Sequence, residues 1–81
     1  MTKEEIFSKL QTILVDKLGV DADDVKLSAH LHDELGMDSL DDVEVIIECE
    51  SVFGISIPDS KIEGKVFTVQ DAVDVLDEII N

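Results

Sequence analysis

One serine stands where its hydroxyl group can be modified chemically. Ser39 follows the segment Leu35 to Asp38 and opens a predicted acidic helix. The free backbone N–H groups and the dipole of a helix N-terminus both favour negative charge, so a phosphate ester suits this position. The alternative is that Asp38 caps the helix and Ser39 merely lies beside it, as Asp and Ser commonly do. Spacing alone favours the capping interpretation.

Neither Ser39 nor Cys49 has the sequence context of a catalytic nucleophile. No base is placed near Ser39 in the sequence, so a serine-hydrolase triad has no support. Cys49, the only cysteine, has acidic and lysine-free surroundings that do not activate a thiolate, and it excludes an intramolecular disulfide. We therefore expect Ser39 to be an acceptor of modification in a chain that is not an enzyme.

The acids and histidines between residues 21 and 34 are candidates for a metal site. His30 and His32, with the two acids that follow them, lack the further spaced ligands of a zinc site. The aspartates that begin at Asp21 weakly resemble a calcium loop, but Lys26 replaces the glycine needed at its sixth position and His32 the glutamate needed at its twelfth. We expect surface histidines and no specific metal site, with weak divalent binding by the clustered acids left open.

Size and charge limit the possible functions. The chain has 81 residues, which suggests a single domain spanning 1–81 with no room for an enzyme cleft and a cofactor fold. Twenty acids against six lysines give a net charge of −14, which argues against nucleic acid and anionic membrane surfaces as partners. Neither a signal peptide nor a membrane-spanning run is present, so the sequence predicts a cytosolic, cytoplasmic protein, expected to be a monomer.

The first half of the chain predicts one helix followed by a long loop. Thr2 and Glu5 form a capping-box pair, apolar residues then recur at helical spacing, and Gly19 ends the helix. The stretch from Val20 to Met37 is long for a loop in so small a domain. We expect four of its apolar side chains to hold it across the core: Val25, Leu27, Leu31 and Leu35.

The second half predicts three more helices. One runs from the Asp38 cap to about Phe53, and Gly54 ends it. A short helical piece starts at Pro58-Asp59, where Gly64 weakens helicity, and Thr68 with Asp71 opens the final helix. Together these elements predict an all-α fold: a small four-helix bundle with three longer helices, one short third helix and a long loop between the first two.

The helix after Ser39 carries two apolar stripes, whereas a single helix of a small domain usually buries one. The stripe expected to face inward consists of Val45, Ile46, Cys49 and Phe53, with Val52 at its edge. The other stripe consists of Leu40, Val43 and Ile47, flanked by Asp41, Glu44, Glu48 and Glu50. An exposed apolar strip with a charged rim is typical of a docking surface. The alternative is that the long loop covers it.

The sequence resembles an acyl carrier protein through a series of motifs in order along most of the chain. They are Leu35-Gly36-Met37-Asp38-Ser39-Leu40-Asp41, Val43-Glu44, Phe53-Gly54 and Ile57-Pro58-Asp59, with Leu18-Gly19-Val20 and Thr68-Val69 in support. The resemblance implies a non-catalytic carrier whose Ser39, between Asp38 and Leu40, holds a 4′-phosphopantetheine arm. Acyl groups would ride on the thiol of that arm as thioesters.

The same resemblance implies partners. They are a phosphopantetheinyl transferase and acyl-transferring and chain-elongating enzymes with basic docking surfaces. We expect these partners to bind the face formed by Leu40, Asp41, Val43, Glu44, Ile47 and Glu48.

Three departures from the family pattern leave the pathway open. They are Met37, Ser51 and the Lys61-containing segment 60–67, all expected near the partner surface. General fatty-acid synthesis and a specialised polyketide or modified-lipid pathway are both compatible with them. A peptidyl carrier is disfavoured, because such domains usually have glycines where this chain has Met37-Asp38. The rival from another class is an unmodified acidic helical interaction module.

Overall fold

Four α-helices make up the fold, as the sequence predicts. The structure, a computed structural model, describes residues 1–81 and contains α1 (Lys3–Leu18), α2 (Ser39–Phe53), α3 (Asp59–Ile62) and α4 (Val69–Ile80). It has no strand, only one isolated bridge between His30 and Thr68. The predicted all-α bundle with three longer helices and a short third helix is therefore confirmed. No helix combines the length and apolar character that crossing a bilayer requires.

Local signals set the ends of the three long helices. Each begins with a capping box, in which the N-cap side chain accepts from the N3 backbone and the N3 side chain accepts from the N-cap backbone. Gly19 and Gly54 adopt the left-handed conformation at the ends of α1 and α2. A residue with a side chain is strained in that conformation, so glycine favours termination at these two points.

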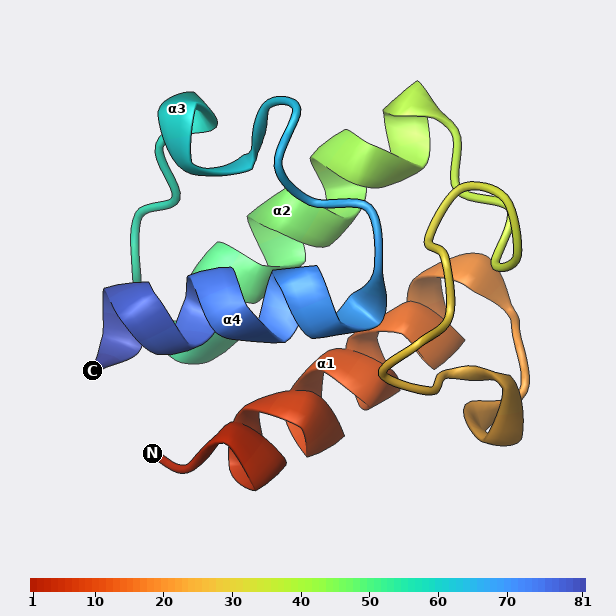
Figure 1. Ribbon diagram of the computed structural model, residues 1–81, viewed down its shortest axis with the longest axis horizontal. Helices are drawn as coiled ribbons and strands as arrows, with labels where there is room; N and C mark the ends of the chain where they lie inside the picture. The colour runs from red at the N-terminus through yellow and green to blue at the C-terminus, as the bar shows by residue number, and fades with distance from the viewer.

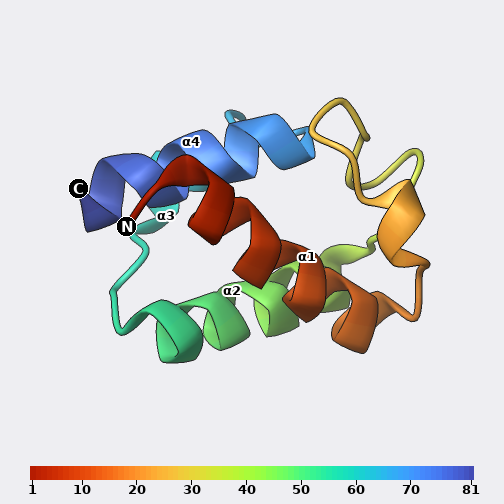
Figure 2. The ribbon, with the colours of Figure 1, turned by 90° about the horizontal axis from the view of Figure 1, so that it is seen from below.

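Helix α1 holds the bundle together. It packs against both α2 and α4, and α2 and α4 share no comparably close packing. Figure 2 shows α4 and α2 on opposite sides of α1. The core is entirely apolar and centres on Ile6, Leu10 and Leu14 of α1, with Val69 and Val73 of α4. The arrangement leaves a space between α2 and α4 that side chains only partly fill.

The long loop 20–37 lies at one end of the molecule (Figure 1). Val25, Leu31 and Leu35 are buried as predicted, but Leu27 is 43% exposed, so the expectation that it anchors the loop is wrong. Ala29, which the sequence does not single out, is buried instead. The loop also contains a 3₁₀ turn, Ala22–Asp24, that the helical periodicity does not reveal.

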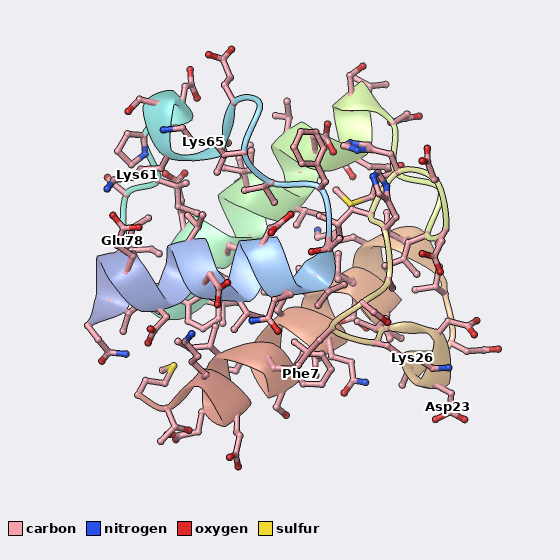
Figure 3. All side chains as sticks on the ribbon, in the orientation of Figure 1. Phe7, Asp23, Lys26, Lys61, Lys65 and Glu78 are labelled. Atoms are coloured by element: carbon pink, nitrogen blue, oxygen red, sulfur yellow. The ribbon has the colours of Figure 1, made fainter.

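Polar contacts fasten the opposite end of the molecule. The two chain termini lie side by side (Figures 1 and 2), and the Met1 ammonium group donates to Asn81 Oδ1. Lys61 of α3 pairs with Glu78 of α4, as Figure 3 shows. Gly64 lies just after α3 with φ +67°, in the turn that leads toward α4.

Candidate functional site

Ser39 is the first residue of α2 and its side chain is exposed. Asp38 is the N-cap: its Oδ1 accepts from the Asp41 N–H at 2.9 Å, and Asp41 Oδ2 accepts from the Asp38 N–H at 3.1 Å. The predicted cap is confirmed. Because Asp38 does the capping, the Ser39 hydroxyl is left without a protein partner.

The other hydroxyls at the starts of long helices are occupied. Thr2 Oγ1 accepts from the Glu5 N–H and Thr68 Oγ1 accepts from the Asp71 N–H, at 3.2 and 3.1 Å. At α2, by contrast, the first N–H groups belong to Ser39 and Leu40, which precede the first intrahelical bond and point away from the helix. An exposed hydroxyl and two free N–H groups therefore share one helix end, where a phosphate group can be accommodated.

The outer stripe of α2 faces solvent. Leu40, Val43 and Ile47 are 74%, 55% and 59% exposed, so the loop does not cover them. Of the acids predicted around this stripe, Glu44 is exposed, while Asp41 is engaged in the capping box. Glu48 lies 3.9 Å from Lys17 Nζ, which offsets part of its charge. The face therefore presents an apolar strip with Glu44 as its most available acid.

A largely apolar cavity of about 320 Å³ lies behind this face, on the inner side of α2. Val45, Ile46 and Cys49 line it from α2, opposite side chains of α4 that include Val75 and Leu76. Asp42 of α2 and Ala72 of α4 also line it. Its remaining lining comes from α1, the long loop and the segment around α3: Leu10, Leu31, His32, Met37, Ile57, Ile62, Glu63, Gly64, Val66 and Phe67. The volume is at the small end of the range for ligand-binding pockets.

Cys49 is buried in the cavity wall, as its stripe predicts. Burial, reinforced by the neighbouring charges of Glu48 and Glu50, raises the pKa of this thiol to about 12. The thiol is therefore protonated at neutral pH and is a poor nucleophile.

The two histidines occupy different surroundings. His32 Nε2 lies 2.9 and 3.0 Å from the two carboxylate oxygens of Asp42, and both residues line the cavity. His30 is half-buried, with its ring centroid 6.3 Å from that of Phe67. No three His, Cys, Asp or Glu side chains come together as a metal-binding group.

Two expectations about this region are wrong. Met37, predicted near the partner surface, is buried and lines the cavity. Its N–H donates to the carbonyl of buried Leu31 at 3.1 Å, which holds this end of the loop against the core. Val52, predicted at the edge of the inward stripe, is exposed. The sequence locates neither the cavity nor the His32–Asp42 pair. A histidine near an acidic helix start is a weak signal for such a pair, and no local pattern indicates the cavity.

Comparisons with known proteins agree with this geometry. The family model described as the phosphopantetheine attachment site matches residues 8–76. The acyl carrier protein of Petrotoga mobilis is 46% identical over 81 residues, which cover all of this chain and 94% of the relative. The acyl carrier protein of Rubrobacter xylanophilus is 47% identical over 78 residues, which cover 96% of this chain and 95% of the relative. The acyl carrier protein of Chlorobium phaeovibrioides is 46% identical over 76 residues, which cover 94% of this chain and 96% of the relative. The chain thus belongs to the acyl carrier proteins, the family built around an attached phosphopantetheine group.

Proposed function

We propose that Ser39 is the attachment site and that this chain carries acyl groups as thioesters on its 4′-phosphopantetheine arm. The observation that carries the proposal is the free, exposed Ser39 hydroxyl at the start of α2, beside an Asp38 that already caps the helix. The N–H groups of Ser39 and Leu40 are placed to donate to phosphate oxygens. The arm supplies the thiol, a role that the buried Cys49 does not suit.

The chain itself performs no catalysis in this proposal. No side chain of the protein forms a hydrogen bond with the Ser39 hydroxyl that would activate it as a nucleophile. A transferase must supply the base and the coenzyme A from which the arm comes. The contribution of the carrier is effective concentration, because a tethered acyl group does not diffuse away between enzymes.

The cavity on the inner side of α2 is the proposed shelter for the acyl chain. Its walls are mostly aliphatic, and burial of each methylene group is favourable by about 0.8 kcal/mol. Asp42, which lines the cavity, is three residues after Ser39 and therefore on the same side of the helix. An arm on Ser39 thus begins close to one rim of the cavity.

Partner enzymes are proposed to bind the outer face of α2, comprising Leu40, Asp41, Val43, Glu44, Ile47 and Glu48. Its exposed apolar strip and net negative charge suit a basic surface with an apolar centre. We place these partners in general fatty-acid synthesis, with a specialised polyketide or modified-lipid pathway as the alternative. A cytosolic location, a monomeric state and a single domain over 1–81 stay predictions.

Intact mass spectrometry tests the attachment site. Incubation with coenzyme A and a phosphopantetheinyl transferase should add the mass of one phosphopantetheine to the wild type and nothing to Ser39→Ala. Ser51→Ala is the matched control, since Ser51 is also exposed on α2, near its other end, and should be modified like the wild type. Modification of Ser39→Ala would refute the assignment. An unmodified wild type would favour the plain interaction module.

Modification kinetics test the docking face. Reversing the charge of Glu44 should slow transferase modification at low salt by more than reversing Glu48, because Glu48 is partly offset by Lys17. The defect should shrink as salt screens the encounter. Leu40→Ala or Ile47→Ala should instead weaken binding with little salt dependence. Unchanged rates in all four folded variants would place the docking surface elsewhere, for example on the Lys61 to Lys65 segment.

A further inference from the structure

The His32–Asp42 pair occupies one rim of the apolar cavity. Both side chains line the cavity, yet they remain 40% and 37% exposed, so the pair lies between the interior and solvent. Asp42 is on the first turn of α2 and His32 is in the long loop. The pair therefore bridges two elements next to the helix end at which Ser39 stands.

This bridge is the only side-chain hydrogen bond or ion pair between residues 20–37 and α2. The other side of the loop is held more firmly, by backbone bonds to the start of α4. Leu31 N–H donates to the Phe67 carbonyl at 2.8 Å, and Val69 and Gln70 N–H donate to the carbonyls of Ala29 and Leu27. Hydrogen bonds thus attach the loop more firmly to the start of α4 than to α2. Its polar connection to α2 is one exposed pair, which is weak enough to break and re-form.

The space behind the bridge is where α2 and α4 lack close packing. If α2 separates from the loop at this rim, the cavity widens beside Ser39, while packing against α1 keeps both helices in the bundle. At the rim beside Ser39, one exposed polar contact closes the cavity, the His32–Asp42 pair. The deeper wall is formed by buried apolar side chains such as Leu10 and Leu76, and the exposed residues Glu63, Gly64 and Phe67 line the cavity beside α3.

We propose that His32 and Asp42 are positioning residues that form a latch on the cavity and retain an acyl chain inside it. The inference rests on the proposed function, because the occupant is the acyl chain carried by Ser39. With the pair formed, the loop and α2 are joined and the chain stays sheltered. With the pair broken, the chain leaves more readily and its thioester is exposed to nucleophiles in solution.

Cleavage by hydroxylamine measures this exposure. The nitrogen of hydroxylamine attacks the thioester carbonyl, the C–S bond breaks, and a hydroxamate and the free thiol of the arm are formed. Decanoyl thioesters of His32→Phe and of Asp42→Ala, which keep no hydrogen-bonding group at these positions, should be cleaved about 1.5- to 5-fold faster than that of the wild type. This range corresponds to about 0.2–1 kcal/mol for an exposed pair. Acetyl thioesters should be cleaved at one common rate, because two carbons gain little from the cavity.

A double mutant and a remote control separate a latch from a general structural effect. His32→Phe/Asp42→Ala should be cleaved no faster than the faster single variant, since the two changes break the same contact. Asp74→Asn removes an exposed pair with Lys3, 3.0 Å long and away from the cavity, and should leave the decanoyl rate unchanged. Circular dichroism confirms that each variant is folded.

The possible results distinguish this inference from the proposed function. A wild type that the transferase does not load at Ser39 would overturn both. A loaded wild type whose decanoyl thioester is cleaved at the same rate as those of the folded variants, or faster, would overturn the latch alone. An equal acceleration of acetyl and decanoyl thioesters would also overturn it, because retention in the cavity depends on chain length.

Discussion

The Cys49 thiol lies in the wall of the cavity and is unreactive as a nucleophile. Its side chain is buried, and burial together with Glu48 and Glu50 raises its pKa to about 12. The ordinary pKa of a cysteine thiol is 9.0, so folding favours the protonated form. This separates it from the solvent-exposed thiol that an attached arm would provide, and avoids a second acylation site.

We therefore predict that Cys49 resists alkylation in the folded protein. At pH 8, iodoacetamide should modify the native thiol at least ten times more slowly than the thiol in urea, because both thiolate formation and access are suppressed. Mass spectrometry of the alkylated product gives the rates. A Ser51→Cys variant, which places a second thiol on the exposed end of α2, should gain one rapid modification. Rapid labelling of native Cys49 would show that the cavity opens freely to solvent.

Single residues also show where the sequence is insufficient for predicting the site. The exposed hydroxyl of Ser39 follows from a motif, and its neighbour Asp38 caps the helix as its type predicts. The inward turn of Met37 and the outward turn of Leu27 do not follow, because both lie in a loop with no periodicity. Their directions depend on the backbone bonds that fix the loop on α4, such as Leu31 N–H to Phe67.

In the first turn of helix α4, Asp71 binds the two residues that precede the helix. Asp71 Oδ2 accepts from the N–H groups of Phe67 and Thr68, both at 3.0 Å. These bonds favour the ionised carboxylate and lower the pKa of Asp71 below its ordinary value of 3.8. Since the pKa in the folded state lies below that in the unfolded state, the stabilisation is present above about pH 4. It is lost as the pH falls through the folded-state value.

Asp71→Asn should therefore destabilise the protein most at neutral pH. We expect a loss of at most about 1 kcal/mol in the free energy of unfolding at pH 7, because the carboxylate is near the surface. The difference from the wild type should shrink at pH 3. Urea unfolding at both pH values measures it. Asp23→Asn, which removes an exposed carboxylate that accepts no hydrogen bond, is the control and should show no such pH dependence. An undiminished difference at pH 3 would mean that the cap acts through geometry alone.

The helices are the part of the fold that local sequence predicts best. Capping residues such as Thr2 and Thr68 and the stop at Gly19 act within a few residues, so their physical effect is visible in the sequence. The cavity arises from tertiary packing, in which α1 contacts both α2 and α4 and holds them apart. Its lining comes from residues as distant as Leu10 and Leu76, and no local pattern encodes that arrangement.

At the scale of the whole molecule, the dominant feature is uncompensated negative charge. Three of the six lysines form ion pairs, namely Lys3 with Asp74, Lys17 with Glu48 and Lys61 with Glu78. The last pair is visible in Figure 3. Twenty acids share a body of only 27 × 24 × 20 Å. The excess charge favours encounter with basic partners, and it also repels itself within the folded state.

Salt should therefore stabilise this protein. At 0.01 M ionic strength the Debye length is roughly 30 Å, which exceeds the longest dimension of 27 Å, so every acid repels every other. At 0.15 M it is roughly 8 Å, and only near neighbours still interact. Salt also weakens the three lysine pairs, but all are exposed and each is worth at most about 1 kcal/mol. Repulsion among the far more numerous acids outweighs that loss, so the melting temperature should rise steadily from 0.01 to 0.5 M NaCl in calorimetry. Millimolar divalent cations should act in the same direction.

Replacing Glu44 by Gln removes one unpaired charge and should raise the low-salt melting temperature more than the high-salt one. A flat or falling trend for the wild type would mean that the folded state disperses its charge as well as the unfolded chain does.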